Sequence, residues 1–128
     1  MSRRLAGKVA VITGGSGGIG LATGRLFAAE GAQVVLVDLD AGRLQAAVAE
    51  IGSNAVSHQV ADVADEAQMR AALADTVARH GRLDVLFCNA GTEGRVLPLT
   101  EMPVEDFDRV LAVNVRGVFL GLKHALPI

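Results

Sequence analysis

Short apolar runs alternate along the chain with longer stretches that carry apolar residues on one face. The runs cover residues 8–13, 33–37, 55–60 and 83–88. The first resembles strands that are buried on both faces, whereas His58 and Gln59 interrupt the third. Alternation of this kind is typical of βαβ units and a parallel sheet. We therefore predict an α/β fold, a doubly wound parallel sheet with strand order 3-2-1-4 and helices on both faces.

Apolar residues at helical spacing predict a helix in each interval between two strands. The three predicted faces are formed by Ile19, Ala22, Leu26 and Ala29, then Leu44, Ala47, Val48 and Ile51, and then Met69, Leu73 and Val77. A glycine follows each helix, as is common where a helix ends in a left-handed residue. These glycines are Gly31, Gly52 and Gly81.

A fourth helix is predicted from about Pro103 to Leu126, and it is apolar around most of its circumference. Its apolar stripe is formed by Phe107, Leu111, Val118 and Leu122. Two further apolar residues, Val115 and Phe119, lie beside the stripe. A helix of this kind must be covered on more than one side. The fourth strand is also expected to have an unpaired apolar edge. We expect either a second copy of the chain, in a homo-oligomer formed through this helix, or a continuation of the chain to cover these surfaces.

The composition is that of one globular domain, with 128 residues of which 51% are hydrophobic and 20% are charged. The formal net charge of -2 gives no electrostatic reason to expect nucleic acid or an anionic membrane as a partner. Cys88 is the single cysteine, which excludes an internal disulfide bond and fits a reducing compartment. No apolar run is long enough for a signal peptide after Arg3-Arg4 or for a membrane span. A cytoplasmic location is therefore expected.

Residues 13–20, Thr-Gly-Gly-Ser-Gly-Gly-Ile-Gly, lie between the first strand and the first helix. A dinucleotide pyrophosphate needs a tight turn at this place, with backbone amides within reach and a helix N-terminus directed at its charge. Two spacings fit the segment: Gly15, Gly17 and Gly20 match G-x-G-x-x-G, and Gly14, Gly18 and Gly20 match T-G-x-x-x-G-x-G. The alternative is a glycine-rich turn that only reverses the chain. A P-loop is excluded because no Gly-Lys-Ser/Thr follows.

Asp38 ends the second strand, where a carboxylate can accept hydrogen bonds from both hydroxyl groups of an adenosine ribose. It would repel a 2′-phosphate, so NAD is favoured over NADP, although the nearby Arg43 could weaken this preference. Asp62 and Val63 follow the third strand, at the edge of the sheet where an adenine would lie. The alternatives are a solvated acid at position 38 and a helix-capping acid at position 62.

These motifs together resemble the short-chain dehydrogenase/reductase family, whose members have a Rossmann-type fold. The resemblance is carried by Thr13-Gly14…Gly18…Gly20, Asp38, Asp62-Val63, Asn89-Ala90-Gly91 and Asn114-Val115-Arg116-Gly117. All five elements appear in the order and at the spacing of the family, and they cover essentially the whole chain. We therefore interpret residues 1–128 as the NAD-binding portion of a single Rossmann domain.

The resemblance implies a role for each of these residues. The pyrophosphate would be bound by Gly14, Ser16, Gly18, Ile19 and Gly20. Asp38 would contact the ribose, and the adenine would contact Asp62 and Val63. The segment that stabilises the central sheet and passes close to the cofactor would be Asn89, Ala90 and Gly91. Many members have a further asparagine where this chain has Cys88, so one hydrogen bond would be lost there.

Asn114 matches the asparagine of the family's catalytic tetrad, which holds a water molecule that links the catalytic lysine to solvent. The residue lies between Leu111 and Val118 on the apolar stripe of the last helix, so burial is expected. A buried amide without a partner costs about 1–3 kcal/mol. The alternative is therefore a structural amide that is tied to the backbone.

The rest of the family's catalytic set is missing from this sequence. Its members supply a serine and a Tyr-x-x-x-Lys pair, in which the tyrosine is the general acid/base and the lysine lowers its pKa. The chain contains no tyrosine, and it ends at Ile128 without a polar tail, so we expect it to be truncated. His58, His80 and His124 lack an evident positioned partner, and no cluster of metal ligands is evident.

The leading hypothesis is an NAD-dependent oxidoreductase that interconverts a small-molecule alcohol and a ketone by hydride transfer, with this chain as its cofactor-binding part. The missing tyrosine favours an alternative, a catalytically inactive nucleotide-binding module. A third possibility is an S-adenosylmethionine methyltransferase, which shares glycine turns and an acid after the second strand. Thr13 and the Asn-Ala-Gly segment argue against it. The identity of the substrate is not encoded in these residues.

Overall fold

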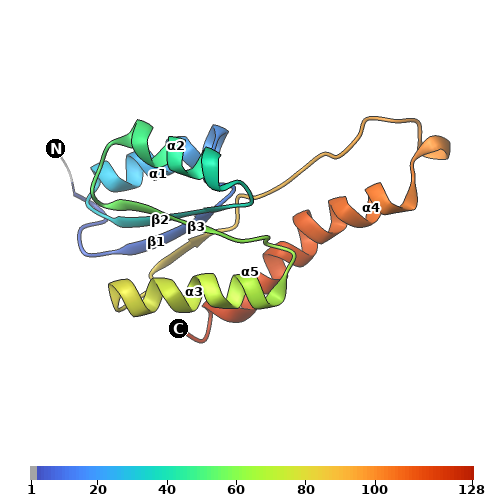
Figure 1. Cartoon of the computed structure of the whole chain (residues 1–128). Helices are drawn as coiled ribbons and strands as arrows, with labels where there is room; N and C mark the ends of the chain where they lie inside the picture. The colour runs from blue at the N-terminus through green and yellow to red at the C-terminus, as the bar shows by residue number, and fades with distance from the viewer. Residues whose placement is uncertain (1–2) are drawn as a thin grey trace.

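The computed structural model describes residues 3–128 and contains a parallel sheet with the strand order β3-β2-β1-β4 (Figure 1). Its strands are β1 (Val9–Thr13), β2 (Gln33–Asp38), β3 (Val56–Val60) and β4 (Val85–Phe87). The predicted fold class and strand order are confirmed. β1 and β2 are almost wholly buried, which explains why the first two apolar runs carry so few polar residues.

The fourth strand is shorter than the predicted range of 83–88. Its ladder with β1 covers Ala10 to Ile12 only. At one end, the side chain of Asp84 accepts a hydrogen bond from the amide of Val9 at 2.9 Å. At the other end, the amide of Asn89 turns back to the carbonyl of Phe87 at 2.9 Å. Both ends of the predicted strand are therefore used in local contacts that interrupt the regular ladder.

Helices cover both faces of the sheet. α1 (Gly18–Ala29) and α2 (Ala41–Ile51) lie on one face, and α3 (Glu66–His80) and α5 (Gly117–Ala125) lie on the other (Figure 1). Neighbouring residues of one strand belong to different cores: Ile12 packs with Leu36 and Leu44, whereas Val11 packs with Met69 and Leu73. This arrangement follows from the alternation of side chains along a strand.

The predicted helix ends are confirmed. Gly52 and Gly81 are left-handed residues that end α2 and α3, and Gly31 has a φ of +99° after α1. Asp65, not Asp62, caps α3, because its side chain accepts a hydrogen bond from the amide of Gln68. The carboxylate of Asp62 instead accepts the amide of Ala64 at 2.9 Å. Asp62 therefore remains at the edge of the sheet.

The predicted apolar face of α1 was wrong. All four residues that defined it are exposed, namely Ile19, Ala22, Leu26 and Ala29. The buried residues of the helix are Gly20 and Gly24. A Cβ on Gly24 would lie 2.9 Å from Cδ2 of Leu36, so the helix lies too close to the sheet for a side chain there. The face that makes the contact is the one with no side chains, and hydrophobic periodicity cannot detect it.

The last predicted helix extends over the expected range, but it is not a regular α-helix. α4 (Val104–Leu111) follows a short 3₁₀ turn (Leu99–Glu101), and a π-helical turn (Ala112–Arg116) joins α4 to α5. The buried residues are Val113, Gly117, Leu120 and Gly121 rather than those of the predicted stripe. A Cβ on Gly117 would lie 2.8 Å from Cγ2 of Val63, so a glycine again marks the contact with the core.

The predicted stripe of the last helix stays largely exposed. Its exposed members include Phe107, Leu111, Val115, Phe119 and Leu122. Whether another chain covers these residues remains a prediction. Among residues 3–128, no helix combines the length and the hydrophobicity that crossing a bilayer requires. The two first residues of the proposed 1–128 domain lie outside the described part of the chain.

Candidate cofactor site

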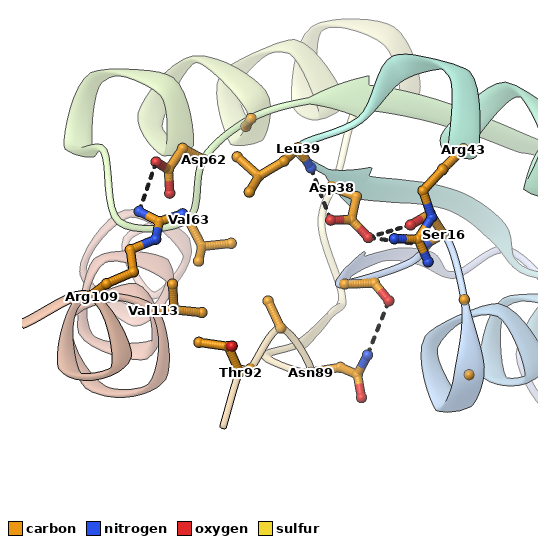
Figure 2. A pocket seen from close by; sticks show the side chains of 16 residues that line it. Ser16, Asp38, Leu39, Arg43, Asp62, Val63, Asn89, Thr92, Arg109 and Val113 are labelled. Carbon is orange, nitrogen blue, oxygen red and sulfur yellow. Dashed lines mark hydrogen bonds and ion pairs between the residues drawn. The ribbon is translucent and has the colours of Figure 1, made fainter. Parts of the chain in front are cut away.

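A cavity of about 480 Å³ lies at the carboxyl ends of the parallel strands, where α/β sheets of this kind bind ligands. Segments from the glycine turn, β2, the end of β3, the loop after β4 and α4 contribute to its wall (Figure 2). Most of the predicted site residues line it: Gly14, Ser16, Gly18, Asp38, Asp62, Val63, Asn89, Ala90 and Gly91. The sheet topology therefore brings together motifs that are far apart in the sequence.

The backbone decides between the two possible glycine spacings. Gly14 and Gly18 have φ angles of +65° and +56°, which side-chain-bearing residues rarely adopt, whereas Gly17 is extended with a φ of -166°. A Cβ on Gly20 would collide with the carbonyl oxygen of Gly14. These are the three glycines of T-G-x-x-x-G-x-G. The additional Gly15 is required by packing, since its Cβ would lie 2.8 Å from that of Leu36.

The first turn of α1 opens onto the cavity without a side-chain cap. Gly17 is the capping residue and has no side chain, and Gly18 lines the cavity. A Cβ on Gly18 would meet no atom within 4 Å, so this part of the turn faces open space. Uncapped amides at a helix N-terminus are donors suited to an anion. The turn is therefore not packed shut by its own side chains.

The carboxylate of Asp38 is held at the mouth of this turn (Figure 2). Its Oδ2 atom accepts a hydrogen bond from the hydroxyl group of Ser16 at 2.5 Å and a second from the Ser16 amide at 3.2 Å. Its Oδ1 atom accepts the amide of Leu39 at 2.9 Å. Asp38 is half-buried and lines the cavity, so it is not a solvated loop acid.

Asp62 and Val63 line the other end of the cavity. The carboxylate of Asp62 forms an ion pair with Arg109 of α4, with an N–O distance of 3.3 Å (Figure 2). Val63 and Val113 are buried and form apolar wall beside this pair. The combination of an apolar wall with a carboxylate suits a heteroaromatic ring that carries an amino group.

The hydroxyl group of Thr13 joins the glycine turn to the loop after β4. It accepts hydrogen bonds from the amides of Asn89 and Ala90 at 3.1 and 3.0 Å. The side-chain amide of Asn89 donates to the carbonyl of Gly14 at 3.2 Å. A Cβ on Gly14 would lie 3.0 Å from both Ala90 Cα and Asn89 Nδ2, so the two segments are in close contact. These contacts of the Asn-Ala-Gly segment therefore hold the glycine turn in position.

Three of the predicted site residues do not line the cavity: Ile19, Gly20 and Asn114. Ile19 is 71% exposed, and Gly20 is buried against Gly14. Asn114 was expected to be buried, but it is exposed in the π-helical turn. Its Oδ1 atom accepts the amide of Thr92 at 2.8 Å, and its Nδ2 atom donates to the carbonyl of Thr92 at 2.7 Å. The amide is therefore tied to the backbone of the loop that follows Gly91.

Several residues of the cavity wall were missed by the sequence reasoning, including Leu39, Arg109 and Val113. The sequence did contain a clue to Leu39, because this apolar residue directly follows Asp38. In the structure Leu39 is 55% exposed. Arg109 lies in none of the motifs and had no such signal. Its contact with Asp62 depends on how close α4 lies to the end of β3, which periodicity does not reveal.

The three histidines lie outside the cavity wall, but one has a partner that was not expected. His124 of α5 lies 2.9 Å from the carboxylate of Glu66, which also forms an ion pair with Lys123 at 2.6 Å. The hydrogen bonds from Lys123 and then His124 lower the pKa of Glu66 to about 2. This cluster joins α3 to α5. Within residues 3–128, no group of three or more potential ligands is placed to hold a metal ion.

Comparison with known proteins identifies the family. The family model described as short chain dehydrogenase matches residues 8–128. The chain belongs to the short-chain dehydrogenase family. Momilactone A synthase of Oryza sativa subsp. japonica is similar to this chain, with 50% identity over 99% of the chain and 47% of its own length. The predicted family is confirmed.

Solved structures of similar enzymes have the same fold. The crystal structure of levodione reductase is 43% identical and has a TM-score of 0.93, over 98% of this chain and 50% of that one. NAD⁺-bound xylitol dehydrogenase is 38% identical with a TM-score of 0.87, over 95% of this chain and 48% of that one. The chain therefore spans about half the length of the short-chain dehydrogenases it matches.

Proposed function

We propose that this chain binds NAD, for an oxidoreductase that interconverts an alcohol and a ketone by hydride transfer. The observation that carries the proposal is the carboxylate of Asp38, which is held by Ser16 and Leu39 at the open end of the glycine turn. A carboxylate at this place accepts hydrogen bonds from ribose hydroxyl groups and opposes a 2′-phosphate. The xylitol dehydrogenase structure, which is NAD⁺-bound, supports the same assignment.

The residues present fit such a dinucleotide. A Cβ on Gly14 or Gly20 would clash within the turn or with the loop after β4, a Cβ on Gly18 would point into open space, and the uncapped first turn of α1 lies at the same cavity. We assign the pyrophosphate to the turn formed by Gly14, Ser16, Gly18, Ile19 and Gly20. Because Ile19 lies outside the wall, its contribution would come from its backbone amide. The adenine would lie against Val63, beside the carboxylate of Asp62.

The bound nicotinamide would supply the hydride acceptor or donor of the reaction. The loop of Asn89, Ala90 and Gly91 would form the wall beyond the pyrophosphate, held in place by Thr13. We propose that Asn114 is the asparagine of the family's catalytic set. Its two contacts with Thr92 fix the amide next to this loop and leave further hydrogen-bonding capacity for a water molecule.

The general acid/base of the reaction would come from outside these residues, since the chain has no tyrosine. We propose that the 128 residues bind the cofactor without turnover and that the whole protein acts on a small-molecule alcohol or ketone. The cytoplasm, a reducing compartment, suits the free Cys88, and burial raises the pKa of its thiol. Because the chain has no tyrosine, an inactive nucleotide-binding module is the second candidate function.

Calorimetric titration tests the proposal directly. NAD should bind, whereas S-adenosylmethionine should not compete with it. Binding of S-adenosylmethionine instead of NAD would overturn the assignment. The intact protein, if it contains a Tyr-x-x-x-Lys pair, should then oxidise alcohols with NAD as the acceptor. Cofactor binding without turnover on a broad panel of alcohols and ketones would favour the inactive module.

We also propose that the exposed face of α4 and α5 forms a homo-oligomer with the same face of a second copy. Phe107, Leu111, Val115 and Phe119 recur every four residues along it, a ridge that can pack against its own symmetry mate.

A further inference from the structure

Asp62 is held at the end of β3 by contacts that involve its backbone and both of its carboxylate oxygens (Figure 2). Its amide donates to Oε1 of Gln68 at 2.8 Å. Its Oδ1 atom accepts the amide of Ala64 at 2.9 Å, and its Oδ2 atom lies 3.3 Å from Nη1 of Arg109. The first two contacts are local, whereas Arg109 lies 47 residues further along the chain. The orientation of the Asp62 carboxylate therefore depends in part on α4.

The ion pair between Asp62 and Arg109 lies in the wall of the cavity, beside Val63 and Val113 (Figure 2). The side chain of Arg109 is 47% exposed and that of Asp62 is 26% exposed. Solvent screens a pair with this exposure, so its loss should have a small effect on the stability of the fold. Its main effect is therefore expected on the geometry of the carboxylate within the cavity.

We propose that Arg109 is a positioning residue for cofactor recognition, which orients the Asp62 carboxylate toward the exocyclic amino group of the adenine. The inference rests on the proposed function, because it assumes that the adenine lies against Val63. A carboxylate oxygen has two acceptor positions, so Oδ2 can pair with Arg109 and still accept an amino N–H. The same oxygen opposes a ring carbonyl oxygen at that place, so its position determines which purine is preferred.

Arg116 offers a matched comparison within the same helical segment. Its Nε atom donates to the carbonyl of Ala64 at 2.9 Å, so it also holds the segment that follows β3. Arg116 is exposed and does not line the cavity, and this contact is with the backbone. Loss of either arginine can loosen the segment, but only loss of Arg109 should change the preference between two purines.

Calorimetry with NAD and with nicotinamide hypoxanthine dinucleotide, in which a carbonyl oxygen replaces the adenine amino group, tests this role. The wild-type protein should bind NAD more tightly by about tenfold or more, as expected for a hydrogen bond to a charged acceptor. Arg109→Met keeps an unbranched stem without the guanidinium, and it should lower this ratio of affinities by about threefold or more. Arg109→Lys should recover part of the ratio, since it keeps the charge and loses the planar geometry.

Arg116→Met is the control, and it should leave the ratio unchanged even if both affinities fall. A second comparison tests whether Arg109 acts through the carboxylate. In an Asp62→Ala background the preference for NAD should be lost, and adding Arg109→Met should not lower the ratio further. Urea denaturation of each variant checks that the fold is retained.

The outcomes separate this inference from the proposed function. If neither dinucleotide binds to the wild-type protein, the proposed function fails. If NAD binds but the wild-type protein does not discriminate, or if Arg109→Met changes both affinities by the same factor, the positioning role is refuted and the proposed function stands. Equal falls of the ratio in Arg109→Met and Arg116→Met would also refute it. A fall in Arg109→Met alone, with partial recovery in Arg109→Lys, supports the inference.

Discussion

The carboxylate of Asp38 is oriented by its neighbours within the chain. Ser16 donates twice to one oxygen, and the amide of Leu39 donates to the other. A ribose that approaches this site would meet an acceptor whose rotamer is already fixed. Little side-chain entropy would be lost on binding, which favours affinity and makes the geometry selective.

Replacement of Asp38 by alanine should therefore weaken NAD binding by about tenfold to a hundredfold, the effect of losing hydrogen bonds to a charged acceptor. The affinity for NADP relative to NAD should rise, because the like charge that opposes a 2′-phosphate is removed. Titration calorimetry with both cofactors measures the ratio. Glu93→Ala removes an exposed acid outside the cavity wall and should leave it unchanged. An unaltered ratio in Asp38→Ala would refute the role of this residue.

Alanine substitutions at two glycines of the turn should differ in their effects on the free energy of unfolding and on NAD binding. In Gly20→Ala, the new methyl group would collide with Gly14 and approach Asn89 Nδ2 to 2.8 Å. The free energy of unfolding should fall by about 1–3 kcal/mol, as expected for overpacking. In Gly18→Ala the methyl group faces open space, so the loss of stability should be smaller, roughly 1 kcal/mol for an alanine at a φ of +56°, and NAD binding should weaken as well. Urea denaturation and calorimetry on both variants check this contrast, and equal losses of stability would contradict it.

At the scale of elements, α3 and α5 are joined by the contacts of Glu66 with Lys123 and His124. The pKa of Glu66 is lowered from 4.5 to about 2, so the ionised carboxylate is favoured in the folded state. The resulting stability is present above the unfolded pKa of 4.5 and is lost as the pH falls toward 2. Wild-type protein should be more stable than Glu66→Gln near neutral pH, and the difference should shrink over that interval.

Urea denaturation at a series of pH values measures the difference in the free energy of unfolding between the two proteins. Glu105→Gln serves as the control, because Glu105 is an exposed glutamate of α4. Its difference from wild type should not vary in the same way with pH. A difference for Glu66→Gln that stays constant from pH 7 to about pH 2 would contradict the assignment.

The sequence could predict those features of the fold that local residue patterns determine. Strand order, the helices and their glycine ends follow from local patterns, and they were confirmed. The apolar face of α1 was missed because its contact with the sheet is made by Gly20 and Gly24, which carry no hydrophobic signal. The exposure of Asn114 was missed because a π-helical turn changes which residues face the core.

The residues of the candidate site also form two groups, those that the sequence could place at the cavity and those that it could not. Residues fixed by their distance from a strand end, such as Asp38 and Asp62, could be placed at the cavity from the sequence. Arg109 could not, because its pairing with Asp62 depends on how close α4 lies to the end of β3 in the folded chain. The partner of His124 was missed for the same reason, since Glu66 belongs to a helix far away in sequence.

At the scale of the whole molecule, the exposed ridge on α4 and α5 predicts self-association. Phe119 is 60% exposed and is the last residue of this ridge. Phe119→Glu should lower the oligomeric state, because burial of a carboxylate in the interface would be strongly unfavourable. Cofactor affinity should not change. Sedimentation velocity measures the oligomeric state, and Val96→Glu, at an exposed loop residue, is the control. An unchanged sedimentation coefficient in Phe119→Glu would refute the interface.

The hydroxyl group of Thr13 has a consequence for protein engineering. It is the shared acceptor for two amides of the loop after β4, at Asn89 and Ala90. A chimaera that received a foreign glycine turn lacking this threonine would leave the Ala90 amide without its acceptor and the Asn89 amide with the Phe87 carbonyl alone. Transfer of the glycine turn to another protein therefore requires residues 13–20 and 89–91 to be exchanged together. The two segments are far apart in the sequence but in contact in the structure.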